Sequence, residues 1–207
     1  MHSSMGGRLM RGAVAGCMLA VALAGCSSDD DPAPATATLG SAPPVTPTTD
    51  PYAVPAVIDA TYVNRVLAGL DAAVGDVVRT VVREKTIPPE VLDRLKTLYM
   101  GEFLQIQLDL FSNDVRESFR QYKPEPGNKK TLVSELLSGA ASCIFARVER
   151  DYSAVAARPN LGVTTQWIGL RPLDRSKDPS KYNPTPWIYS YDGFQQDGSA
   201  PSNPCAT

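Results

Sequence analysis

Histidine is almost missing from this 207-residue sequence, since the only one is His2. It lies in a segment that we interpret below as a removable export signal. Without histidine, the remaining chain lacks the base of a Ser-His-Asp or Cys-His mechanism. It also lacks the ligand that most zinc and iron sites use. Any catalysis would therefore rest on Asp, Glu, Tyr, Lys or Arg, and the sequence predicts no metal site and no cofactor.

An excess of basic residues is missing as well. The chain has 20 Lys and Arg against 22 Asp and Glu, which gives a formal net charge of −2. Proteins that bind nucleic acid usually carry a basic patch that neutralises phosphates. We therefore do not expect nucleic acid among the partners of this chain.

The apolar stretch near the N-terminus is too short to cross a membrane. It reads AVAGCMLAVAL from Ala13 to Leu23, eleven residues without a charge, and Arg8 and Arg11 precede it. A membrane-spanning helix needs about 20 apolar residues. A positive segment followed by an apolar core of about 7–15 residues is the layout of a secretory signal.

The residues Leu23-Ala24-Gly25-Cys26 end this stretch, and they resemble the lipobox of bacterial lipoproteins. In that family the cysteine thiol receives a diacylglyceryl group, the signal is cut before the cysteine, and the new amine is usually acylated, for example with palmitate. The resemblance implies a signal peptide over 1–25 and a chain held in membrane lipid through Cys26, on the extracytoplasmic side of the cell membrane. Two acyl chains, at about 0.8 kcal/mol per buried methylene, give a stable anchor. The alternative is an ordinary signal with a chance cysteine.

Cysteine is scarce, with four in the whole chain. Cys17 would leave with the signal and Cys26 would carry lipid, so Cys143 and Cys205 remain. An even pair in an oxidising compartment predicts one disulfide bond. The alternative is two independent thiols, one of them buried.

Residues 26–56 predict a disordered tether. Between Ser27 and Ala56 seven of thirty residues are proline, and most of the others are Ala, Thr or Ser. Such a segment cannot bury enough apolar surface to offset its ordering entropy, and its prolines favour an extended chain. We therefore expect a single folded domain over 57–207.

Two long segments at the start of this domain have helical spacing. From Val63 to Val82 the valine and leucine residues follow one another at steps of one, three or four, with Asp59 as a plausible N-cap. Pro89 can open a second helical region that runs to about residue 122. Within it, residues 104–110 alternate apolar and polar residues and would also suit a strand, although the flanking segments favour a helix. The segment KKTLVSELLSG, residues 129–139, predicts a short third helix.

The last third of the chain predicts three antiparallel strands, over residues 143–155, 164–173 and 186–193, because these segments alternate and are rich in Trp, Tyr, Ile and Thr. Helices followed by strands indicate an α+β class, with two to three N-terminal helices packed on a curved antiparallel sheet of about three strands. This arrangement resembles the NTF2-like cone fold. The tail WIYSYDGFQQDGSAPSNPC is also similar to lipoproteins from high-GC Gram-positive bacteria. Enzymes of the NTF2-like fold often use an Asp-His pair, which this chain cannot supply.

One face of the first predicted strand carries Arg147, Glu149 and Asp151, by the two-residue alternation of a strand. If that face lined a cone, the two carboxylates could bind a cation or act as acid and base. The alternative is a solvated face with cross-strand ion pairs. Arg150 lies on the opposite, more apolar face and would need a partner when buried, for which we expect Asp174 or a carboxylate on a helix.

A second group of candidates is aromatic. These residues could line a pocket for an apolar or sugar ligand, or they could pack in the core and across strands. They lie on two of the predicted strands: Trp167, Trp187, Tyr189 and Tyr191.

Together these features predict a membrane-anchored envelope lipoprotein. Its domain would bind a partner protein or a small apolar ligand without catalysis. The alternative is an enzyme with an NTF2-like cone that uses Glu149 or Asp151 as its general base.

Overall fold

The computed structural model describes residues 50–116, 121–158, 162–174, 181–193, 199 and 201–206. The predicted signal peptide, the lipobox and most of the tether lie outside the described residues. Within the described ranges, no helix combines the length and the apolar character that a membrane span requires.

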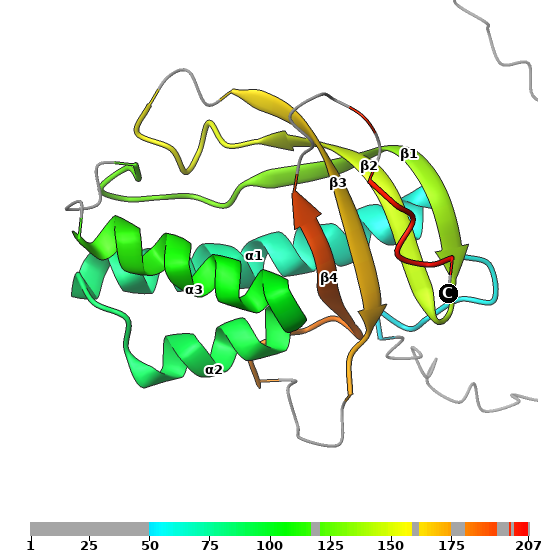
Figure 1. The fold of residues 1–207 in the computed structure, drawn as a ribbon, viewed down its shortest axis with the longest axis horizontal. Coiled ribbons are helices and arrows are strands. Elements are labelled where there is room, and N and C mark those ends of the chain that lie inside the picture. Colours follow the sequence, from blue (N-terminus) through cyan, green and yellow to red (C-terminus); the bar gives the residue numbers. More distant parts are fainter. Residues whose placement is uncertain are drawn as a thin grey trace, which may run out of the picture. The chain divides into compact units, whose positions relative to one another are not determined.

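Among the described residues, three helices precede four strands, and the helices cover one face of the sheet (Figure 1). The strands form one antiparallel sheet in the order β1-β2-β3-β4. The predicted α+β class is therefore confirmed, with four strands in place of three. The elements are α1 (Ala60–Glu84), α2 (Pro89–Leu98), α3 (Gly101–Arg116), β1 (Lys130–Ala140), β2 (Cys143–Asp151), β3 (Val163–Pro172) and β4 (Trp187–Gly193).

Helix α1 begins at its predicted N-cap. The side chain of Asp59 accepts a hydrogen bond from the backbone N–H of Tyr62 at 2.7 Å, which satisfies one of the free donors of the first turn. Lys85 ends the helix in the left-handed conformation, with φ at 53°. Pro88 then precedes α2, and Pro89 takes its first position, where a missing N–H costs nothing.

The second helical region is interrupted between α2 and α3. Tyr99 is extended and forms a parallel bridge with Tyr189 of β4, and the N–H of Met100 donates to the carbonyl of Tyr189 at 3.0 Å. Gly101 follows with φ at +58°, a conformation that glycine adopts without strain. Residues 104–110, which alternate like a strand, are helical as predicted.

The predicted third helix over 129–139 is wrong, because this segment forms the edge strand β1. Two register shifts along β1 each place an extra residue opposite β2. Thr131, Val133 and Leu136 therefore face Arg150, Val148 and Ala146, at steps of two and then three residues. A β-bulge changes the local period of a strand in this way, so the apolar spacing imitates that of a helix.

The core lies between α1, α2 and the helix-facing side of the sheet. Its strand residues come from alternate positions of β2 and β3, as expected for a sheet that is covered on that face. The larger members are fully buried and include Val66, Leu67, Leu70, Leu95, Ile144, Val148, Ile168, Leu170 and Trp187.

The predicted disulfide bond joins Cys143, at the start of β2, to Cys205 near the C-terminus. Around it the end of the chain lies against β3. Arg171 donates to the carbonyl of Pro204, and a Cβ added to Gly169 would come within 3.0 Å of the Pro204 ring. The C-terminal segment, drawn in red in Figure 1, thus covers part of the sheet near β2 and β3.

Candidate ligand-binding cavity

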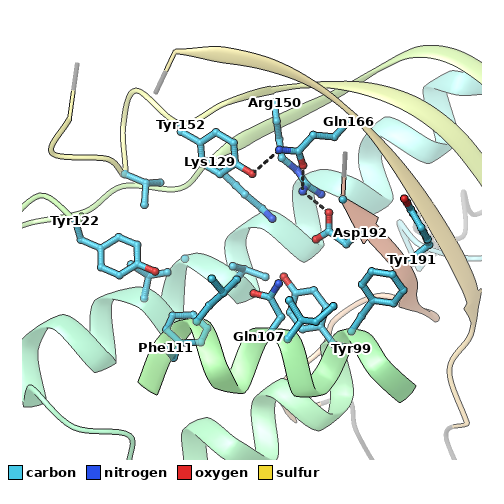
Figure 2. Close-up of a pocket in the computed structure, with 18 residues that line it drawn as sticks. Tyr99, Gln107, Phe111, Tyr122, Lys129, Arg150, Tyr152, Gln166, Tyr191 and Asp192 are labelled. Atoms are coloured by element: carbon cyan, nitrogen blue, oxygen red, sulfur yellow. Dashed lines mark hydrogen bonds and ion pairs between the residues drawn. The ribbon is translucent and has the colours of Figure 1, made fainter. Parts of the chain in front are cut away.

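A cavity of about 540 Å³ lies between α1, α3 and the sheet (Figure 2). Its volume falls within the range of about 300–1,000 Å³ that is usual for small-molecule sites. Most of the lining is aliphatic or aromatic, and the polar residues gather at one end, except for Gln107 on α3. The apolar and aromatic lining consists of Val74, Val78, Tyr99, Phe103, Ile106, Leu110, Phe111, Tyr122, Val155 and Tyr191.

Helix α3 supplies one apolar wall. Phe103, Ile106, Leu110 and Phe111 follow one another at helical steps, so they share the face of α3 that is turned to the cavity. The ring of Phe103 contacts that of Tyr191, with centroids 5.0 Å apart. Ile106 and Leu110 keep 39% and 50% of their surface exposed, so the cavity opens to the surface beside these two side chains.

Arg150 is the centre of the polar end. Its side chain, 2% exposed, forms an ion pair with Asp192 of β4, and its Nη1 also donates to Oε1 of Gln166 at 2.7 Å. The Nε atom donates to the hydroxyl of Thr131 at 3.1 Å. Gln166 in turn donates to the hydroxyl of Tyr152 at 3.2 Å. Figure 2 shows this connected group above the apolar wall.

Asp71 of α1 joins the same network from the helix side. Its carboxylate accepts hydrogen bonds from the backbone N–H of Thr131 at 2.7 Å and from the hydroxyl of Thr131 at 3.0 Å. The Nζ of Lys129 lies 3.8 Å from Asp71 Oδ1. Burial raises the pKa of Asp71, and the nearby charges of Lys129 and Arg150 and the hydrogen bonds from Thr131 offset part of this effect.

Burial shifts the pKa of the Arg150 guanidinium and the pKa of the nearby tyrosine phenols in opposite directions. Burial by itself would lower the pKa of Arg150, but Asp192, Tyr189 and Tyr152 raise it well above its ordinary value, so the side chain stays charged. Burial also raises the pKa of Tyr99 and Tyr189 well above the ordinary value. These two phenols therefore stay protonated and do not act as bases near neutral pH.

The predicted carboxylate candidates lie away from the cavity. Arg147 and Glu149 are exposed, and Asp151 is partly buried; none of the three lines the cavity. The backbone N–H of Ser153 donates to Asp151 at 2.7 Å and holds the pKa of this carboxyl below its ordinary value. In register, Arg147 lies opposite Glu135 of β1 and Trp167 of β3.

Of the aromatic candidates, only Tyr191 lines the cavity. Trp187 and Tyr189 are fully buried in the core, and the indole N–H of Trp187 donates to the hydroxyl of Tyr62 at 2.8 Å. Trp167 is buried as well, but it is opposite Arg147 in the register and so lies on the other face of the sheet.

The expected ion-pair partner of Arg150 also needs correction. The partner is Asp192, near the end of β4, and not Asp174. The expected helix carboxylate is present as Asp71, which reaches Arg150 through Thr131. Lys129 and Gln166 carry no sequence signal of their own, because their role depends on strand pairing.

Comparison with family models, with curated proteins and with solved structures found no match to this chain. Within the part of the chain that the structure describes, no three His, Cys, Asp or Glu side chains gather as they would around a metal ion. The assignment of function therefore rests on the chemistry of the cavity itself.

Proposed function

We propose that this chain is an envelope lipoprotein, anchored through an acylated Cys26, whose folded domain binds a small and largely apolar molecule without transforming it. The single observation that carries the proposal is the 540 Å³ cavity with an apolar wall on α3 and a polar end at Arg150. Sites for small ligands typically combine a mostly apolar lining with a few placed polar groups.

The placement of the cavity favours a small ligand over a protein partner. It lies between a helix layer and a sheet, and a protein surface would reach only its exposed rim at Ile106 and Leu110. The enzyme alternative gains no support from the same geometry, because Glu149 and Asp151 do not line the cavity.

We propose further that the fold is a variant of the NTF2-like cone. Three leading helices, an antiparallel sheet that follows them, and a cavity between α3 and the sheet support this relationship.

Ligand binding is tested by native mass spectrometry of the protein after gentle extraction from its host. We expect a bound small molecule in the unmodified protein and its loss in Leu110→Trp, because an indole at this exposed position would fill the mouth of the cavity. The matched control is Leu137→Trp on β1, where a side chain 41% exposed does not line the cavity. Finding no bound molecule in any of the three proteins would contradict the proposal.

The anchor is tested by fractionation of the host cells. Cys26→Ala should release the protein from the membrane fraction, because the residue that receives lipid is lost. Cys17→Ala, within the predicted signal, should leave the protein anchored. If the Cys26→Ala protein remained in the membrane fraction, the lipoprotein assignment would be wrong.

A further inference from the structure

The ammonium group of Lys129 is the least satisfied charge in the cavity. The side chain is only 9% exposed, and it extends into the cavity in Figure 2. Its nearest carboxylate oxygen, on Asp71, is 3.8 Å from Nζ, which is too long for a hydrogen bond. An ammonium group has three donors, and burying them without acceptors is unfavourable.

The described residues around Lys129 offer it little more. Both oxygens of Asp71 already accept hydrogen bonds from Thr131. The carboxylate of Asp192 is neutralised by its direct ion pair with Arg150. The ring of Tyr189 lies 5.7 Å from Lys129 Nζ, a contact that stabilises a cation but supplies no acceptor for a directed hydrogen bond.

Arg150 contributes a second donor of the same kind. Its Nη2 atom is buried, lies against the Tyr189 side chain and makes no hydrogen bond of normal geometry among the described residues. The polar end of the cavity therefore has hydrogen-bond donors on two cationic side chains, Lys129 and Arg150, that have no acceptor among the described residues. A ligand group that accepts hydrogen bonds and carries negative charge would complement it.

We propose, on the basis of the binding function above, that the ligand is an amphipathic carboxylate. Its carboxylate accepts hydrogen bonds from Lys129 Nζ at the polar end, and its apolar body lies along Phe103, Ile106 and Leu110 of α3. The volume is sufficient, because 540 Å³ lies within the range of about 300–1,000 Å³ that is usual for sites of drug-sized ligands. An unbranched ten-carbon acid fits within this space.

The headgroup is tested with three probes that share one ten-carbon tail. Decanoate, decan-1-ol and decyltrimethylammonium are titrated into the full chain carrying Cys26→Ser, which cannot be acylated at this position. Binding is followed by isothermal titration calorimetry below the critical micelle concentrations. We expect decanoate to bind roughly tenfold more tightly than either of the other probes, because only the carboxylate makes charge-assisted hydrogen bonds with Lys129.

Two substitutions locate the headgroup. Lys129→Met keeps an unbranched stem of similar size but loses the ammonium, so it should reduce the affinity for decanoate to about that for decan-1-ol. Lys129→Arg keeps the charge and should retain the preference for decanoate. Circular dichroism spectra and melting curves check that both variants fold, and the three-probe series on the parent chain decides the question even if one of them does not.

The possible outcomes separate the two proposals. Equal affinity for the three probes, or tighter binding of the cationic probe, would overturn the carboxylate inference while leaving the binding function in place. A parent chain that binds none of the three probes would overturn the binding function and the inference with it. Retention of the decanoate preference in a folded Lys129→Met variant would show that Lys129 does not hold the headgroup.

Discussion

The two faces of strand β2 treat their charged residues in opposite ways. Arg150, on the helix-facing side, is 2% exposed and is held by Asp192, Gln166 and Thr131. Its neighbour Glu149 and the nearby Arg147, on the other side, are exposed to solvent. The difference shows that the number of partners a charged residue of this sheet has depends on its burial and not on its residue type. A buried charge needs partners, and an exposed one does not.

The largest expected difference in stability between the two faces comes from substitution of Arg150. Arg150→Met should lower the free energy of unfolding by about 3–5 kcal/mol, because it leaves Asp192 buried without its partner. The matched control Arg147→Met should change it by less than about 0.5 kcal/mol, as surface substitutions usually do. Urea unfolding followed by circular dichroism measures both. Similar losses in the two variants would mean that the faces do not differ as described.

The next largest effect on stability is expected from the disulfide bond, which holds the C-terminal segment against the sheet. Cys205→Ser releases the segment that the disulfide bond holds against β3 across a sequence separation of 62 residues. We expect a loss of about 2–4 kcal/mol, because the unfolded chain regains the freedom that the bond removes. A reducing agent should lower the melting temperature of the unsubstituted protein in the same way and have no further effect on Cys205→Ser. Unchanged melting of the reduced protein would contradict a stabilising role for the bond.

The smallest expected effect is on the pH dependence of stability, which should have opposite signs for Asp71, on the helix side, and Asp151, on the other face of β2. Asp71 has a pKa raised above its ordinary value of 3.8, chiefly by burial. Its contribution to stability is therefore fully present below the ordinary value and is lost as the pH rises through the raised value. Asp151 has a pKa lowered from 3.8, chiefly by the backbone hydrogen bond from Ser153. Its contribution is present above that value and is lost as the pH falls.

Asp71→Asn and Asp151→Asn should therefore change the slope of stability against pH in opposite directions. With increasing pH above 3.8 the stability of the parent should fall relative to Asp71→Asn. With decreasing pH below 3.8 it should fall relative to Asp151→Asn, by a smaller amount because Asp151 is in contact with water. Urea unfolding between pH 3 and pH 7 gives both slopes. Two slopes of the same sign would show that the environments of the two carboxylates are alike.

Local chemistry explains which parts of the fold could be predicted from the sequence. The N-cap at Asp59, the two prolines at the start of α2 and the alternation along β2 each involve residues a few positions apart, so their spacing is visible in the chain. The same rules failed for β1, because its two bulges shift the inward-facing positions by one residue each. The apolar residues of β1 follow one another at steps of one and three, as on a helix, as long as the partner strand is unknown: Leu132, Val133, Leu136 and Leu137.

The candidate site was less accessible to prediction than the fold. Tyr191, one of four aromatic candidates, lines the cavity, and Arg150 has the ion-pair partner that a buried charge needs. Lys129 was placed in a helix, so the direction of its side chain could not be inferred. The walls of the cavity come from elements far apart in the sequence, and no local pattern marks them as neighbours.

The sequence by itself determined the α+β class, the start of α1, the three later strands and the cysteine pair, because helical and strand periods, caps and a count of cysteines are local or compositional properties. Only the tertiary structure decided which charged residues of β2 became buried and where the cavity formed. The backbone N–H of Thr131 donates to Asp71, 60 positions earlier, and the indole N–H of Trp187 donates to Tyr62, 125 positions earlier. Such contacts depend on how the sheet curves and packs on the helices, and the free energy that selects them is shared among many residues.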